Sequence, residues 1–236
     1  MLVTLYNREE MHAFSNRAGV MYINGLGNID TGMFETSTPH YEIGSRRFRV
    51  RRSTLMDVAE SIERSPQVVL AKDALSIGLE LDLPFIERML EIGGGNGGFS
   101  IISSIAFKVK IKSYESSAEN FKLLLKNLRR FEAEEMVEAV NADGREADVD
   151  AFESIFIDHP EPWIFLDCEL HPPKKVASVL PTYSQAEKFS RFLLKKDFLV
   201  NTHQLIEIPH KLSKIGMRPE TMVMYHTGFI VSGKKW

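Results

Sequence analysis

The chain has little of what several classes of protein require. It holds one cysteine, Cys168, so no disulfide can form within it, and no Cys/His group has zinc-site spacing. We therefore expect neither metal nor redox chemistry. No apolar run approaches the roughly 20 residues of a membrane span, and the start lacks the basic and apolar regions of a secretory signal. We expect a soluble, cytoplasmic protein with no membrane partner.

Length and charge set further bounds. With 236 residues, 44% of them hydrophobic, the chain can form one full domain and one small domain. The formal net charge of -3 does not favour a nucleic-acid partner. Binding depends on local patches more than on total charge, however, so the balance excludes no partner.

Two regions differ in pattern. Residues 1–53 hold short apolar pieces separated by turn residues, which predicts a small β-rich domain. In residues 54–236, helical spacing at 54–65 and 73–83 is followed by alternating strands and helices. Strands are predicted at 87–93, 110–115, 136–142 and 154–159, and helices at 97–107, 117–131 and 182–196. This alternation predicts an α/β, Rossmann-like domain whose mostly parallel sheet is covered on both faces.

Two further strands are predicted near the end, at 198–208 and 221–233. Only a loop separates them, which is too short for a crossover helix, so they should pair antiparallel.

The sequence EIGGGNGGFS, residues 91–100, places five glycines directly after a predicted strand. Without side chains, a ligand can approach backbone N–H groups at the start of the next helix. Gly93, Gly95 and Gly98 match GxGxxG, which alone is a weak sign of a dinucleotide site. Glu91 would repel a pyrophosphate and suits a ligand with an ammonium group, such as S-adenosylmethionine. The alternative is a tight turn with no ligand.

The next two predicted strands also end in acids. Glu115 follows the glycines by roughly 20 residues, where a carboxylate accepts hydrogen bonds from ribose hydroxyls. Asp143 follows the third strand, at the edge where open α/β sheets bind ligands, and suits an adenine amino group. Each acid alone is better explained as a solvated loop carboxylate, but three at successive strand ends indicate a nucleoside site.

The fourth strand ends in FIDHPEPW, residues 156–163. Two prolines make a rigid turn that holds the Asp158 carboxylate and the Trp163 ring near the expected ligand, an arrangement that suits a flat heterocycle. The alternative is a stiff loop whose tryptophan fills a gap in the core.

With these segments in order, nearly the whole chain resembles the tRNA (adenine-N1)-methyltransferases that modify T-loop position 58, and in archaea also position 57. The resemblance runs through residues 48–73, MLEIGGGNGGFS, SYES, FIDHPEPW, SVLPTYSQ and the terminal RPETMVMYHTGFIVSGKKW. It implies a class I methyltransferase domain with a seven-stranded sheet and an antiparallel last strand, and a small N-terminal domain able to contact tRNA. It also implies S-adenosylmethionine as the methyl donor, tRNA as partner and a homotetramer.

The resemblance assigns roles to matching residues. Asp158 would face the target base, and Gln185 would belong to the pocket wall. Donor binding would fall to a set at the strand ends, namely Glu91, Gly93, Gly95, Asn96, Gly97, Glu115, Ser116, Asp143, Gly144 and Asp158. The chain departs from the family at Leu70 and Val179, where members often have tyrosines that line the base pocket.

The chemistry follows from the adenine itself. Its N1 atom is an unprotonated lone pair at neutral pH, so methyl transfer needs placement but no general base. Positive charge then develops on the base, and a carboxylate near the N6 amino group, the role we give to Asp158, stabilises it. Pairing hides N1 in folded RNA, so the base must swing into a pocket where Trp163 or Tyr183 covers its face.

A cationic segment, RRFRVRR at 46–52, is the predicted RNA contact. On a strand, Arg47, Arg49 and Arg51 share one face and can track phosphates, while Phe48 and Val50 fill the core. An ordinary charged strand face paired with nearby acids is the alternative.

Two other functions stay open from the sequence. A non-catalytic tRNA-binding subunit could keep this fold with an altered base pocket, as Leu70 and Val179 permit. An adenine-N6 methyltransferase could use the Asp158 turn to accept from the amine.

Overall fold

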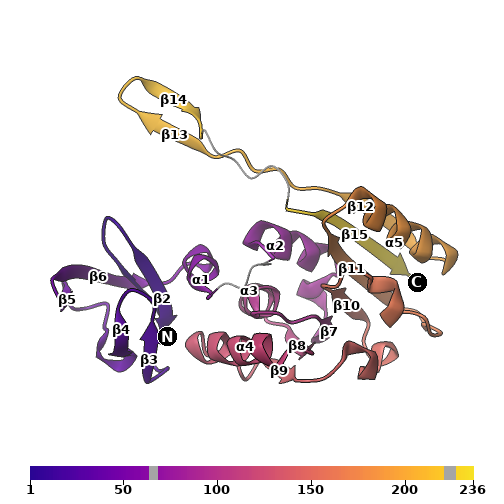
Figure 1. Ribbon diagram of the computed structural model, residues 1–236, viewed down its shortest axis with the longest axis horizontal. Coiled ribbons are helices and arrows are strands. Elements are labelled where there is room, and N and C mark those ends of the chain that lie inside the picture. The colour runs from indigo at the N-terminus through magenta and orange to yellow at the C-terminus, as the bar shows by residue number, and fades with distance from the viewer. Residues whose placement is uncertain (64–68, 221–226) are drawn as a thin grey trace.

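The computed structural model describes residues 1–63, 69–220 and 227–236, in which an N-terminal β region joins a larger α/β region (Figure 1). The N-terminal region holds an antiparallel sheet of order β2-β1-β6-β5 and a separate β3–β4 hairpin. Its strands are β1 (Leu2–Tyr6), β2 (Met11–Ser15), β3 (Val20–Ile23), β4 (Gly27–Asp30), β5 (Tyr41–Ile43) and β6 (Arg46–Arg52). The predicted β-rich region is confirmed.

Alternation along β6 builds the core of this region. Phe48 and Val50 are buried with Val3, Leu5 and Phe14, while Arg47 and Arg49 between them are exposed. Because successive strand residues point to opposite faces, the strand presents arginines outward and apolar groups inward, as predicted.

The two regions are joined by hydrogen bonds around α1 (Leu55–Ser61). Asp57 closes the capping box of this helix with Thr54, and it also accepts from Thr4 Oγ1 at 3.0 Å and from Arg51 Nη2 at 2.7 Å. Burial alone would raise the pKa of Asp57, but hydrogen bonds from Arg51, Thr54 and Thr4 hold that pKa below its usual value. The carboxylate therefore stays charged and anchors β1 and β6 to the first helix.

A second link joins β2 to the larger region. The Ala13 amide donates to Ser61 Oγ at 2.8 Å, and the Ala13 carbonyl accepts from Arg130 Nε at 2.9 Å. Ala13 also packs in the same apolar cluster as Val58 and Ile77. Since the core crosses the boundary, the division at residues 53 and 54 stays a prediction.

The larger region is built on a seven-stranded sheet of order β12-β15-β11-β10-β7-β8-β9. Its parallel strands are β7 (Arg88–Ile92), β8 (Lys110–Tyr114), β9 (Val137–Val140), β10 (Ser154–Ile157) and β11 (Lys174–Leu180). The last strand, β15 (Phe229–Lys235), lies antiparallel between β11 and β12 (Leu199–His203). The chain reverses its direction of winding between β7 and β10, where open α/β sheets bind ligands.

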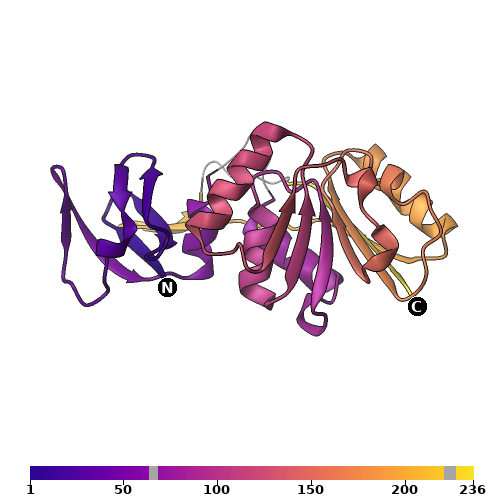
Figure 2. The same ribbon diagram turned by 90° about the horizontal axis from the view of Figure 1, so that it is seen from below.

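Helices cover both faces of this sheet (Figure 2). Met89 points to a cluster with α2 (Ala71–Glu80), α3 (Gly98–Phe107) and α4 (Ala118–Arg130). Its neighbour Leu90 points to a second cluster with α5 (Tyr183–Lys195). The predicted helices and doubly covered sheet are thus confirmed. Among the described residues, no helix has the length and apolar character that crossing a membrane requires.

Two elements were not located from the sequence. Strand β11 begins with Lys174 and Lys175, which are buried because Lys174 Nζ donates to the carbonyls of Asp150 and Phe152 and Lys175 pairs with Glu153. Two lysines at the start of a strand conceal its apolar pattern.

The connection expected to be only a loop contains the β13 (His210–Ser213) and β14 (Gly216–Pro219) hairpin. The expectation of a plain loop was wrong, because Leu212 and Met217 face each other in an antiparallel register. Figure 1 shows this hairpin as an arm reaching away from the sheet. Residues 221–226 of the last predicted strand lie outside the described residues, while its second half forms β15.

Candidate functional site

The carboxyl ends of β7, β8, β9 and β10 meet at one edge of the sheet, and we call the residues there the strand-end site. The Asp158 amide donates to the Ile92 carbonyl at 2.8 Å, and the Gly93 amide donates to the Tyr114 carbonyl at 2.8 Å. Backbone bonds thus tie the glycine loop to both neighbouring strand ends. The predicted acids Glu91, Glu115 and Asp158 are brought together in consequence.

Most glycines of the loop are required by protein packing. A Cβ on Gly93 would lie 2.2 Å from the Asp158 carbonyl oxygen, and one on Gly94 would lie 2.3 Å from Ser113 Oγ. A Cβ on Gly97 would lie 2.7 Å from a Leu124 methyl group. Gly95 differs, because no atom lies within 4 Å of its Cβ position. Open space for a ligand is therefore found at Gly95, not along the whole loop.

Glu91 is buried beneath this loop, with its side chain facing α3 and β8. Its Oε2 accepts hydrogen bonds from the hydroxyls of Ser100 and Ser113. Burial raises its pKa, the two hydroxyl bonds lower it, and the charges of Asp158 and Glu115 raise it, so that it lies at about 7. The structure places Glu91 beneath the glycine loop, and its predicted role toward an ammonium group stays a prediction.

Glu115 holds the loop from the neighbouring strand. One carboxylate oxygen accepts from the Gly95 amide at 2.8 Å, and the other accepts from the Ser117 amide at 2.7 Å. A carboxylate has about four lone-pair positions, so it can still accept from ligand hydroxyls. This geometry suits its predicted role.

Asp158 is exposed to solvent at the end of β10, although many protein atoms lie around it. These protein atoms and the nearby Glu115 charge together raise its pKa to about 6. The charge of Glu115 thus disfavours the ionised forms of Glu91 and Asp158, and a bound cation would favour those ionised forms.

Asp143 is already paired. Its carboxylate accepts from the Arg145 guanidinium, with Nε at 3.0 Å, and from the Arg145 amide at 2.9 Å. Those bonds, helped by His159, lower its pKa to about 2, so it stays ionised. Arg145 and His159 were missed by sequence reasoning, because only the folded structure shows that they face Asp143. Arg145 follows Asp143 by two residues, which is the only sequence signal for that pair.

Three other predicted donor residues differ in what they contact. The Asn96 side chain is buried and bonds the Glu63 carbonyl and the Gly98 amide, so it fixes the loop instead of facing a ligand. Gly144 packs against Ile92. Ser116 is exposed at the end of β8, and no hydrogen bond of its side chain is found among the described residues.

The FIDHPEPW turn connects to α5. Gln185 Nε2 donates to the Pro160 carbonyl at 3.1 Å, and Gln185 Oε1 accepts from Thr182 Oγ1 at 2.7 Å. Gln185 therefore positions the turn that carries Asp158. Trp163 is half-buried, with Lys188 Nζ 3.8 Å from its ring centroid, while Tyr183 is 78% exposed and packs on Phe229. Of the two rings, Tyr183 has the more accessible face.

The predicted arginine face divides into two parts. Arg51 is bound to Asp57, as in the alternative of a paired strand face. Arg47 and Arg49 are exposed, and neither forms an ion pair among the described residues. The expected phosphate contact of Arg51 is therefore revised.

Leu70 lines a mostly apolar cavity of about 550 Å³ between α1, α2, α3 and residues 205–207. Lys72 beside it was not singled out as a functional residue. Its Nζ donates to Asp73, to the Leu205 carbonyl and to Thr227, and so ties α2 to the chain on both sides of the arm.

Comparison with known proteins agrees with this architecture, although no protein-family model matches the chain. A tRNA (adenine(58)-N(1))-methyltransferase TrmI from Thermus thermophilus is 26% identical over 197 residues, which are 79% of this chain and 76% of that protein. The solved SAM-dependent O-methyltransferase from Thermotoga maritima aligns with a TM-score of 0.78 at 23% identity, over 99% of this chain and 92% of that one. The tRNA (m1A58) methyltransferase TrmI from Aquifex aeolicus gives 0.75 at 24%, over 100% and 97%. The chain therefore has the class I methyltransferase fold with a small N-terminal β region.

Substitutions of two loop glycines should separate packing from ligand space. Both have positive φ, +85° at Gly93 and +53° at Gly95, so either alanine costs about 1–2 kcal/mol of backbone strain. Gly93→Ala should cost about 1–3 kcal/mol more in the free energy of unfolding, because its Cβ overlaps the Asp158 carbonyl. Denaturant unfolding measures both. Equal losses would contradict the packing role assigned to Gly93.

Proposed function

We propose that this chain is an S-adenosylmethionine-dependent methyltransferase that acts on N1 of an adenine in the tRNA T-loop, at position 58. One observation carries the proposal: Glu115 holds the Gly95 amide beside open space, Asp158 lies at the end of β10 and Glu91 beneath the loop, and the pKa values of Glu91 and Asp158 are raised. The substrate is suggested by the Thermus thermophilus relative, whose name gives adenine 58 of tRNA.

The residues present fit this donor. A ligand carrying an ammonium and a sulfonium group would favour the ionised forms of Glu91 and Asp158, whose raised pKa values it would lower. A dinucleotide would bring its pyrophosphate against the same carboxylates, which disfavours NAD. Glu115 has lone pairs left for ribose hydroxyls, and Asp143 is fixed by Arg145 near the end of β9, where it can accept from an adenine amine.

Bound S-adenosylmethionine supplies an activated methyl group, and the protein then has three tasks. It must place the target N1 in line with that methyl, exclude water and stabilise the positive charge that develops on the base. Asp158 performs the last task when ionised, because its carboxylate near N6 favours the charged product-like state over the neutral base. Gln185 supports it by fixing the Pro160 carbonyl in the same turn.

The target base needs a face to pack on once it leaves its pair. We assign this to Tyr183, whose ring is accessible at the start of α5, in preference to Trp163, which Lys188 covers. Arg47 and Arg49 supply phosphate contacts from the N-terminal region. The mass analysis described below also tests whether position 57 is modified.

The arm supports the proposed homotetramer. Leu212, Ile215 and Met217 on the β13–β14 hairpin are 79%, 95% and 72% exposed. Apolar side chains gathered on a protruding element are typical of an interface between protomers.

Mass analysis of a tRNA transcript treated with the protein and donor decides between the three functions. N1-methyladenosine at position 58 supports the proposal, and N6-methyladenosine supports the amine alternative. Binding of donor and tRNA without any transfer supports the non-catalytic subunit.

The donor site makes a prediction for Glu115. Calorimetry should show binding of S-adenosylmethionine or its demethylated product, and Glu115→Ala should weaken it by about 1.5–3 kcal/mol, as for hydrogen bonds to a charged group. Glu119→Ala, on the exposed first turn of α4, removes the same charge and should leave affinity unchanged. Tight NAD binding with no response to S-adenosylmethionine would overturn the donor assignment.

The Asp158 carboxylate should control transfer itself. Asp158→Asn keeps size but removes the charge, so single-turnover methyl transfer should drop by on the order of 10²–10³ with only a modest fall in donor affinity. Because the pKa of Asp158 in the free protein is about 6, kcat/KM of the parent should fall as pH decreases through that value, and the Asn variant should lose this inflection. Asp167→Asn, an exposed control, should transfer at the parent rate. A parent-like rate for Asp158→Asn would make this residue a structural turn residue.

If the arm forms an interface between protomers, replacing its exposed apolar residues should change the oligomeric state. Replacing Leu212, Ile215 and Met217 together by serine should lower the mass measured by light scattering, because the apolar contacts between protomers are lost. Val20→Ser, another exposed apolar position, serves as control. A monomeric parent, or an arm variant with the parent mass, would contradict the proposal.

A further inference from the structure

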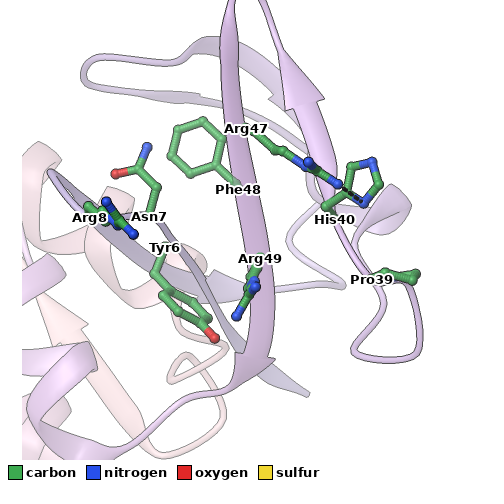
Figure 3. Close-up of a pocket in the computed structure, with 8 residues that line it drawn as sticks. All are labelled: Tyr6, Asn7, Arg8, Pro39, His40, Arg47, Phe48 and Arg49. Carbon is green, nitrogen blue, oxygen red and sulfur yellow. Dashed lines mark hydrogen bonds between the residues drawn. The ribbon is translucent and has the colours of Figure 1, made fainter.

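A cavity of about 500 Å³ opens on the N-terminal sheet, apart from the strand-end site (Figure 3). Its walls come from β1 and the residues just after it, from the segment before β5 and from β6. Figure 3 shows Tyr6 close to Arg49, and the Arg47 side chain pointing toward His40. Arg8 also lines this cavity, so three guanidinium groups surround it.

These three arginines lack the acidic partners that their neighbours have. On the same strand, Arg46 pairs with Glu10 and Arg51 pairs with Asp57. Among the described residues, no carboxylate lies within ion-pair distance of Arg8, Arg47 or Arg49, and no Asp or Glu lines the cavity. The hydrogen bond that Arg47 makes with its side chain goes to His40 Nδ1, at 2.9 Å. Three cations without counterions around one cavity are suited to an anion with several oxygens.

The remaining lining suits more than a bare phosphate. The cavity is within the roughly 300–1,000 Å³ range of small-molecule sites. The half-buried Tyr6 supplies an aromatic ring, and the Asn7 side chain adds an amide donor and acceptor. The Arg51 guanidinium, which Asp57 holds, lies over the Tyr6 ring at 5.4 Å from its centroid and so packs against one face of the ring. A phosphate, a sugar and a base that stacks on the ring would use all of these groups.

We propose that this cavity binds one unpaired nucleotide of the RNA substrate, at a distance along the RNA from the methylated adenine. Arg8, Arg47 and Arg49 hold its phosphate, and Tyr6 stacks on its base. The proposal rests on the proposed function for the identity of the RNA. Figure 1 shows the N-terminal sheet at one end of the molecule, beyond α1, so the two sites contact different parts of one folded RNA. The pocket would thereby make methylation depend on the shape of the RNA.

The test uses the full chain and the tRNA transcript of the methylation assay, with affinity measured by fluorescence titration at several salt concentrations. The combined Arg8→Gln, Arg47→Gln and Arg49→Gln variant should reduce the slope of log affinity against log salt by about 0.7–0.9 per lost contact. Arg191→Gln, Lys195→Gln and Lys196→Gln together remove the same charge from α5 and should leave the slope nearly unchanged.

Stacking has a different signature. Tyr6→Leu should weaken RNA binding by roughly 5- to 150-fold, corresponding to about 1–3 kcal/mol per stacked base, with the salt slope of the parent. Tyr6→Phe keeps the ring and should bind like the parent. If Tyr6→Leu binds normally while the arginine variant loses slope, the cavity holds phosphate without a base and the nucleotide proposal is wrong.

The outcomes for the two proposals are separable. If the parent methylates tRNA and the arginine variant keeps both its salt slope and KM, the pocket proposal fails and the proposed function stands. If the parent never transfers a methyl but binds the transcript through these arginines and Tyr6, the pocket stands and the proposed function fails. Donor affinity should be the parent's in every pocket variant, because none of the changed residues lies at the strand-end site.

Discussion

The crowding of Glu91, Glu115 and Asp158 at one edge of the sheet is the constraint on which the candidate site depends. Burial of Glu91, the protein atoms around Asp158 and the negative charge of Glu115 raise the pKa of Glu91 to about 7 and that of Asp158 to about 6. Two serine hydroxyls donate hydrogen bonds to Glu91, and two backbone amides donate hydrogen bonds to Glu115. Among the described residues no hydrogen-bond donor holds the Asp158 carboxylate, so protein groups do not neutralise its charge.

This arrangement exists because the strands approach closely. Gly93 contacts the backbone of Asp158, and Gly94 contacts Ser113, so the absence of two β-carbons lets β7, β8 and β10 bring their ends together. The same glycines fix the loop that leaves Gly95 open. A rigid scaffold therefore places the acids before any ligand arrives, which is the condition for electrostatic preorganisation.

The sequence could predict the fold and the place of the site, but not the bonding within it. Apolar periodicity and the rule that parallel strands end at one edge were sufficient to bring Glu91, Glu115 and Asp158 together. The bonds of Asp143 to Arg145, of Asn96 to the Glu63 carbonyl and of Arg51 to Asp57 are seen only in the folded structure, and all three side chains were expected to face ligands. Strand β11 was not located because its first two lysines are buried by bonds to carbonyls and acids far away in the sequence. The β13–β14 hairpin was not located because its residues are exposed, so no alternation of apolar and polar residues marks a buried face.

Strand β6 shows how one charged segment serves two purposes. Arg51 lies at the end nearest α1, where Asp57, held in the capping box, takes its guanidinium and so fixes the strand to the larger region. Arg49 and Arg47 lie further along the same strand, beyond the reach of that acid, and keep their charge for a partner. Because the strand is already anchored, these side chains are displayed on a fixed backbone, and binding an anion costs less conformational entropy than it would on a loose loop. Because Asp57 pairs with Arg51 alone, while Arg47 and Arg49 form no ion pair among the described residues, a chain with a net charge of -3 can present a localised cationic face.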